Sequence, residues 1–172
     1  PAPGGTLVYT VREPYGVGAV ITPWNGPIGQ AGRSVAPALA AGNAVVIKPA
    51  EETCLTTFEL ALVCHQAGVP PDAFNVITGF GDEAGEALTH HRLVAKINFT
   101  GSVETGRRIM TAAAQRIVPV GLELGGKSPF IVFADANVDG AARRAADTVI
   151  RNSGQVCSAG TRHLVERPVL EA

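Results

Sequence analysis

Short apolar runs rich in Val, Ile and Phe alternate with longer segments in which apolar residues recur every three or four positions. Near-continuous short runs are typical of strands buried on both faces, and the longer period is typical of amphipathic helices. The runs predict strands over residues 18–22, 44–48, 74–78, 96–100 and 129–133. Regular strand–helix alternation indicates an α/β fold with a doubly wound, mostly parallel sheet. A further edge strand is expected over residues 7–13.

Helical periodicity fills the intervals between these strands. The stripes lie at Leu55, Phe58 and Leu62, at Ile109 and Met110 after Ser102, and along residues 138–150. Gly68 followed by Pro70 ends the first of them. A helix is also expected over residues 28–41, with Pro37 near its start or at a kink. Ligands of such a fold are expected beyond the carboxyl ends of the strands.

Composition narrows the classes of protein. The 172 residues are 46% hydrophobic and 17% charged, which is the balance of a packed domain. A net charge of -1 gives no reason to expect nucleic acid or a membrane as partner. No apolar run has the length of a membrane span, and the N-terminus lacks a signal-peptide pattern. Three cysteines without zinc spacing suit a reducing compartment, so a cytoplasmic protein without a metal site is expected.

Three residues in glycine-containing strings are candidates for covalent chemistry. Cys157 in NSGQVCSAGTR is a candidate nucleophile, although an isolated cysteine also serves as a small core residue. Glu123 in LELGGKSP is a candidate general base, exposed by the flexible glycines that follow it. The amide of Asn25 in PWNGP can donate to a developing oxyanion, or it can close an Asx turn. Neighbouring Trp24 is a core residue or a pocket wall.

Other polar residues after strands are candidates for nucleotide binding. Gly81 belongs to GFGDEAG, which resembles the GxGxxG dinucleotide-binding loop except that its third glycine comes one position late. An ordinary strand-to-helix turn explains the string equally well. Gly101 and Ser102 open a predicted helix directly after a strand, where free amides can receive a phosphate. Lys48 and Glu51 end another strand and could together hold a ribose. The alternative for this pair is two exposed loop charges.

Five strings occur in the order and spacing of one known family. PYGVGAVITPWN, APALAAGNAVVIKPAEET, FTGSVETGRRI, LELGGKSP and NSGQVCSAGTR resemble the aldehyde dehydrogenase superfamily, and the resemblance runs from residue 14 to residue 162. It implies a nicotinamide-dinucleotide domain of modified Rossmann type. By the same resemblance, Cys157 attacks the aldehyde, Asn25 and the Cys157 amide form the oxyanion hole, and Glu123 activates the water that hydrolyses the thioester.

The resemblance also assigns the cofactor residues. It implies that Lys48 and Glu51 hold the adenosine ribose, that Ser102 contacts the pyrophosphate, and that Trp24 walls the cleft. A carboxylate at Glu51 would repel a 2′-phosphate, so NAD is expected rather than NADP. Glu123 favours hydrolysis over transfer to coenzyme A. Gly26 departs from the bulky aromatic that the family shows after the asparagine.

Family members are several times longer than 172 residues, so a fragment is expected. Residues 1–124 would form the NAD-binding unit, and residues 125–172 would begin an incomplete catalytic unit carrying the nucleophile loop. The parent is expected to act on a small-molecule aldehyde as a homodimer or homotetramer, and the isolated chain to turn over little or not at all. The alternatives are a non-catalytic nucleotide-binding module and a truncated remnant.

Overall fold

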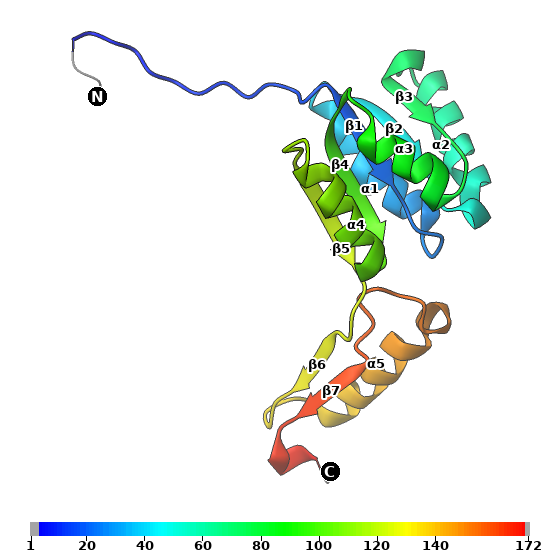
Figure 1. Ribbon diagram of the computed structural model, residues 1–172. Helices are drawn as coiled ribbons and strands as arrows, with labels where there is room; N and C mark the ends of the chain where they lie inside the picture. Colours follow the sequence, from blue (N-terminus) through cyan, green and yellow to red (C-terminus); the bar gives the residue numbers. More distant parts are fainter. Residues whose placement is uncertain (1–3, 171–172) are drawn as a thin grey trace.

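A computed structural model describes residues 4–170, in which five parallel strands form the main sheet (Figure 1). The strand order is β3-β2-β1-β4-β5. The strands are β1 (Val17–Ile21), β2 (Ala44–Lys48), β3 (Phe74–Val76), β4 (Val94–Gly101) and β5 (Val120–Leu124). The predicted α/β fold with a parallel sheet is therefore confirmed.

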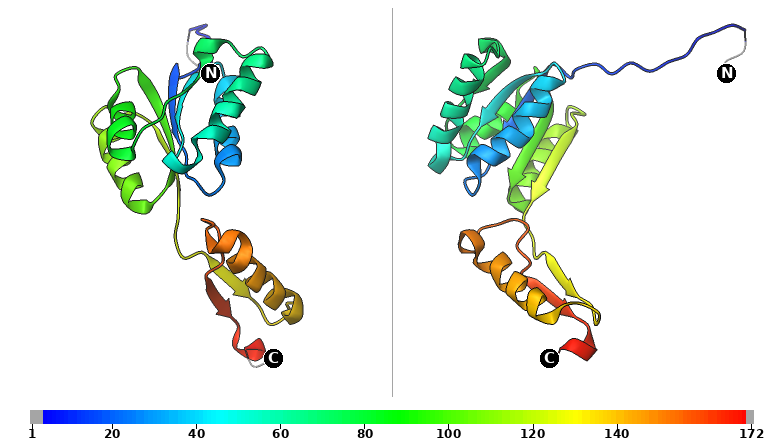
Figure 2. Two further views of the ribbon diagram at one scale, coloured as in Figure 1. Left: turned by 90° about the vertical axis from the view of Figure 1, so that its right-hand side faces the viewer. Right: turned by 180° about the vertical axis from the view of Figure 1, so that it is seen from behind.

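Helices cover both faces of this sheet. α1 (Pro27–Ala40) and α2 (Cys54–Gln66) lie on one face, while α3 (Glu86–His90) and α4 (Val103–Ala114) lie on the other (Figure 2). The chain builds outward from β1 to β3 and then returns to place β4 on the other side of β1. The order reverses between β1 and β4, and their carboxyl ends border the crevice where such sheets bind ligands.

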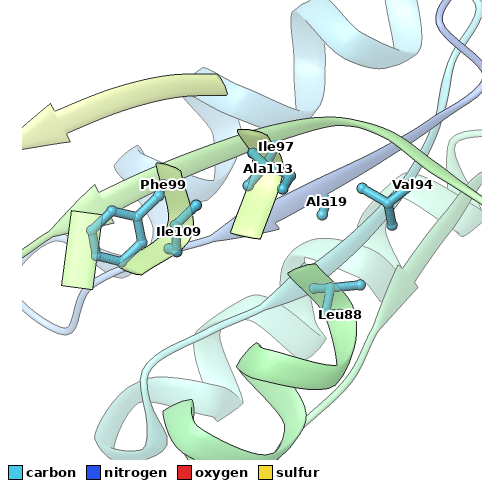
Figure 3. Packing of buried hydrophobic residues seen from close by; sticks show 7 residues of the cluster. All are labelled: Ala19, Leu88, Val94, Ile97, Phe99, Ile109 and Ala113. Carbon is cyan, nitrogen blue, oxygen red and sulfur yellow. The ribbon is translucent and has the colours of Figure 1, made fainter. Parts of the chain in front are cut away.

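Two apolar layers hold the helices to the sheet. Because successive side chains of a strand point to opposite faces, Ala19 enters one layer and Val20 enters the other. The first layer joins the sheet to α3 and α4 (Figure 3) and contains Ala19, Leu88, Val94, Ile97, Phe99, Ile109 and Ala113. The second joins the sheet to α1 and α2 and contains Val20, Ala31, Val35, Val45, Ile47, Ala61 and Phe74.

A smaller unit follows the main sheet. β6 (Pro129–Val132) and β7 (Arg162–Val165) pair in parallel, and α5 (Val138–Ile150) connects them. Figure 1 shows this unit beyond the carboxyl ends of the main strands, next to the expected ligand edge. None of the helices in residues 4–170 is long and apolar enough to cross a membrane.

Strands formed at all five predicted apolar runs, but two further strands were missed. β5 carries glycine and glutamate in a five-residue stretch, and β7 is a four-residue strand with Arg and His. Each forms backbone hydrogen bonds with one parallel neighbour: β5 pairs with β4, and β7 pairs with β6. Such short mixed-polarity strands depend on that neighbour and carry little periodic signal of their own.

The expected edge strand over residues 7–13 was wrong. This segment has no regular secondary structure, and Leu7 and Tyr9 are 81% and 73% exposed. Figure 1 shows it leading away from the sheet. Alternating apolar residues form a strand only beside a partner that takes up their backbone hydrogen bonds, and no described strand lies alongside these residues.

The helix at α2 was predicted correctly, but its buried face was not. Leu55 and Phe58 of the predicted stripe are exposed, whereas Thr57 and Ala61 are buried against the sheet. α2 has apolar residues around most of its circumference, so periodicity alone does not select a face. The small side chains of Thr57 and Ala61 allow the helix to approach the sheet closely.

Replacing Gly101 by alanine should destabilise the fold by about 1–3 kcal/mol, because overpacking a filled core costs that much. A Cβ at this position would lie 2.4 Å from Cζ of Phe99, whose ring is buried. The free energy of unfolding from urea titration measures the effect.

Gly32→Ala is the matched control. Gly32 lies inside α1 with nothing within 4 Å of an added Cβ, so alanine should stabilise the protein by about 1 kcal/mol through helix propensity. Equal effects of the two substitutions would contradict the packing argument.

Candidate active site

Cys157 lies in the connection between α5 and β7, and it is half-buried. Three consecutive residues just before it, Asn152, Ser153 and Gly154, have left-handed φ angles of 51°, 56° and 76°. Only glycine adopts this conformation without a steric penalty. The nucleophile loop therefore begins in a sharp, strained turn.

Asn25 lies directly against this loop. Its Nδ2 donates to the carbonyl of Gln155 at 2.8 Å, and Nδ2 of Asn152 donates to the carbonyl of Asn25 at 3.3 Å. The Asn25 side chain bonds across to the loop of Cys157, and Pro27, two residues on, has no N–H that could close an Asx turn with Asn25 Oδ1. An Asn amide carries two N–H groups, so one hydrogen remains for another acceptor.

Glu123 lies on β5, beside Thr100 of β4. Its Oε1 is 2.9 Å from a terminal guanidinium nitrogen of Arg33 on α1, and both side chains are about half exposed. Exposed pairs of this kind contribute about 1 kcal/mol or less, so the carboxylate can leave Arg33 at little cost. It is an ionic contact that sequence spacing did not indicate.

The segment after Glu123 also reaches the nucleophile loop. Ser128 Oγ donates to the carbonyl of Cys157 at 3.4 Å. Two segments distant in the chain therefore contact the loop of Cys157: Asn25 bonds Gln155 and Asn152, and Ser128 bonds Cys157. The Glu123 carboxylate contacts Arg33 instead. The sequence placed both segments in motifs, but their contact with the loop of Cys157 appears only in the fold.

Lys48 is buried at the end of β2 and forms an ion pair with Glu51, whose side chain is 37% exposed. Lys48 is 2% exposed, which excludes the alternative that it is an exposed loop charge. Its Nζ donates to Glu51 Oε1 at 3.1 Å and to the Pro49 carbonyl at 2.9 Å. A buried ammonium needs such partners because its desolvation is otherwise very costly.

The pKa of Glu51 is below its usual value. Burial acts to raise this pKa, but hydrogen bonds from the Glu51 backbone, from Lys48 and from the Gly81 backbone, with the charge of Lys48, outweigh it. Glu51 is consequently ionised at neutral pH.

Ser102 is the N-cap of α4. Its Oγ accepts from the backbone N–H of Thr105 at 3.2 Å and donates to Thr105 Oγ1 at 3.0 Å. Gly101 precedes it at the end of β4. The first turn of α4 thus begins at the carboxyl edge of the sheet, where its free amides favour an anion.

A cavity of about 660 Å³ lies between α3 and α4. The walls include Gly81 and Gly85 from the turn before α3, Ile21 from β1, and Thr105 and Ile109 from α4. Its volume is in the range of small-molecule and cofactor sites, and its lining combines the apolar Ile21, Ile109 and Ala112 with several polar and charged side chains.

Of the predicted cofactor residues, Gly81 lines this cavity, whereas Lys48 and Ser102 lie next to residues that line it. The Gly81 backbone acts to lower the pKa of Glu51, and a Cβ on Gly85 would lie 3.6 Å from Cδ of Lys48. Ser102 bonds Thr105, which lines the cavity. Trp24 is 45% exposed and lies outside the cavity lining.

Several residues of the site were missed by sequence reasoning. They are Arg33, Ser128, Asn152, Gln155 and the ion pair of Glu86 with Arg108 across the cavity walls. Asn152 and Gln155 stand inside the string that contains Cys157, which was the available signal. Arg33 lies on an exposed helix face, and nothing in the pattern distinguishes it. Within residues 4–170 there is no group of three His, Cys, Asp or Glu side chains placed to hold a metal ion.

Curated proteins are similar in sequence to this chain. The chain is 52% identical over 161 residues to betaine aldehyde dehydrogenase 1 of Oryza sativa subsp. japonica, covering 94% of this chain and 32% of that protein. It is likewise 52% identical over 162 residues to phenylacetaldehyde dehydrogenase of Pseudomonas fluorescens, with the same coverage of 94% and 32%. The chain thus spans about a third of the length of these curated relatives.

Solved structures agree. A putative aldehyde dehydrogenase from Burkholderia cenocepacia superposes with a TM-score of 0.89 at 50% identity, over 95% of this chain and 36% of that one. The NAD+ complex of an aldehyde dehydrogenase from Bacillus cereus gives a TM-score of 0.87 at 44% identity, over 91% and 32%. The model of the aldehyde dehydrogenase family matches residues 1–172, and the chain therefore belongs to that family.

Proposed function

We propose that the protein containing this chain oxidises an aldehyde to a carboxylic acid with NAD. The observation that carries this proposal is the hydrogen bond between the Asn25 amide and the Gln155 carbonyl. This bond supports Asn25 as an oxyanion donor near the loop of Cys157, the candidate thiol nucleophile, beyond the carboxyl ends of the main strands. Relatives named aldehyde dehydrogenases support the reaction class.

Cys157 carries the first step. Its thiolate attacks the aldehyde carbon, and the carbonyl electrons move onto oxygen as the C–S bond forms. The remaining N–H of Asn25 and the backbone N–H of Cys157 stabilise that oxyanion. NAD, when bound, accepts the hydride that leaves the same carbon, so that a thioester on Cys157 remains.

Glu123 carries the second step. It takes a proton from water, whose oxygen attacks the thioester, and the C–S bond breaks to release the acid and the thiolate. In the structure its carboxylate faces Arg33. The weak exposed pair lets the side chain turn from Arg33 toward Cys157 when the thioester has formed.

The residues around the cavity fit a dinucleotide. The buried Lys48 and the ionised Glu51 offer a donor and an acceptor for ribose hydroxyls, and the capped start of α4 at Gly101 and Ser102 suits a pyrophosphate. The cavity bounded by Gly81 has the size and apolar walls that a base requires. Trp24 follows β1 and, although it lies outside the lining of this cavity, would wall the cleft in the whole protein. The negative charge of Glu51 opposes a 2′-phosphate and favours NAD over NADP.

We extend the proposal to the organisation of the parent. Residues 1–124 form the NAD-binding unit, and residues 125–172 begin the catalytic unit. The parent is a homodimer or homotetramer that acts in the cytoplasm on a small-molecule aldehyde, with no nucleic-acid or membrane partner. Some relatives bear names that place them in peroxisomes or chloroplasts. The relatives' aldehydes differ, from betaine aldehyde to phenylacetaldehyde, so we assign no single substrate.

Titration with NAD and NADP should show tighter binding of NAD. Glu51→Gln should lower the ratio of the Kd for NADP to the Kd for NAD about tenfold, equivalent to ~1.4 kcal/mol. Removing the carboxylate removes its repulsion of the 2′-phosphate. The single tryptophan, Trp24, reports binding through quenching and energy transfer to the reduced cofactor. Glu52→Gln is the matched control, because Glu52 is a neighbouring carboxylate that pairs with neither Lys48 nor any other described cation. Absence of binding to either cofactor would overturn the nucleotide proposal.

The pair of Lys48 and Glu51 should make stability depend on pH. Because the pKa of Glu51 is lowered by folding, its contribution is present above the pKa of the unfolded chain and is lost as the pH falls through the folded pKa. Glu51→Gln should therefore be less stable than wild type at neutral pH, and the difference should shrink in acid. Urea unfolding at a series of pH values measures it; a difference that stays constant with pH would contradict the pairing.

In the full-length protein, Cys157→Ser should abolish aldehyde oxidation while leaving the Kd for NAD unchanged. Glu123→Gln should instead slow thioester hydrolysis, so that rapid-mixing experiments show a burst of NADH followed by a slow steady state.

The isolated 172-residue chain should bind NAD but turn over little, since a positioned thiol needs the surrounding catalytic domain. NAD binding by full-length protein without any aldehyde oxidation would favour a non-catalytic binding module, and concentration-dependent aggregation without binding would favour a remnant.

A further inference from the structure

Asn152 occupies a bridging position between two loops of the site. Its Nδ2 donates to the carbonyl of Asn25 at 3.3 Å and to the carbonyl of Gln155 at 3.2 Å. The Gln155 carbonyl also accepts from Nδ2 of Asn25 at 2.8 Å. The two N–H groups of Asn152 thus serve two carbonyls, one in its own loop and one in the loop of Asn25.

The backbone of this turn is strained in a way that serves the bridge. Asn152 and Ser153 have φ and ψ of 51°, 36° and 56°, 32°. Asparagine tolerates the left-handed region better than most residues, but serine gains little from it. Strained residues persist where surrounding contacts determine them, and they cluster at functional sites. The hydrogen bonds from Asn152 to both loops are contacts of that kind.

We propose that Asn152 is a positioning residue whose side-chain amide clamps the nucleophile loop to the backbone of Asn25, and so holds Cys157 beside the Asn25 amide. The inference rests on the proposed function, because it concerns the geometry of the same thiol and oxyanion donor. Asn152 itself touches neither group that reacts. It acts by fixing Gln155, two residues before Cys157, to the loop that carries the donor.

The clamp has a specific consequence for catalysis. The Asn25 amide and the Cys157 thiol lie on different loops, and Asn25 and Gln155 are 130 residues apart in the sequence. The distance between amide and thiol is therefore set by contacts between these loops. Misplacement of reacting groups by about 1 Å costs on the order of 100-fold in rate. Losing the clamp should lower kcat strongly, while the cavity between α3 and α4 and its affinity for cofactor stay as they were.

Asn152→Gly and Ser153→Gly form a matched pair for the test in the full-length protein. Glycine at either position accepts the left-handed backbone without strain, but only the first substitution removes the clamping amide. Asn152→Gly should lower kcat about 10- to 100-fold with the Kd for NAD unchanged, and Ser153→Gly should keep kcat within about twofold. Asn152→Asp is the second variant, since it keeps the shape, tolerates the backbone and cannot donate; it should behave like Asn152→Gly.

Two further measurements separate positioning from a merely structural role. Asn152→Gly should change the emission of Trp24, which adjoins the released Asn25 loop, and should alter the alkylation rate of Cys157 relative to Cys54 in the same molecule. Urea unfolding should show that it remains folded. The inference is overturned if both Asn152 variants keep wild-type kcat, or if Ser153→Gly loses as much activity as they do. Failure of the proposed function looks different, because wild type itself would then not oxidise aldehydes.

Discussion

The central position of β1 is the constraint on which the site depends. β1 pairs in parallel with β2 on one side and with β4 on the other, so all three strands end at the same edge. That edge receives the Asn25 loop from β1, the Lys48 and Glu51 pair from β2, and the start of α4 from β4. Ala19 and Val20 face opposite apolar layers, so the strand cannot slip by one residue without exposing both cores.

Polar groups at this edge are stabilised by contact with each other across loops. Burial of Lys48 is possible because Glu51 and the Pro49 carbonyl accept hydrogen bonds from its ammonium group. The Gly81 backbone in turn acts to lower the pKa of Glu51. Removing Glu51 would leave the buried Lys48 ammonium with the Pro49 carbonyl as its remaining partner, which costs more than the bond itself contributes. These contacts lie next to the cavity that Gly81 and Gly85 line, so they both stabilise the fold and adjoin the proposed cofactor site.

The candidate catalytic groups are held less tightly than the candidate cofactor groups. Glu123 and Arg33 are both half exposed, and the Cys157 loop rests on a few hydrogen bonds from Asn25, Asn152 and Ser128. Loops with few buried contacts open at low free-energy cost. In the proposed reaction the base moves between its contact with Arg33 and the thioester, and a weak exposed ion pair allows that movement.

The sequence by itself determined the fold class, the apolar runs that became strands, the helices between them, and the strings that carry Cys157, Glu123 and Asn25. Those features are local, since period, capping and glycine placement are written in neighbouring residues. Only the tertiary structure decided that β5 and β7 are strands, that residues 7–13 are not, and that α2 buries Thr57 and Ala61. It also decided the contacts of Arg33 with Glu123 and of Asn152 with Asn25. These features are strand pairing, the choice of the buried helix face and contacts between loops. All of them depend on residues distant in the chain, which a local sequence pattern does not identify.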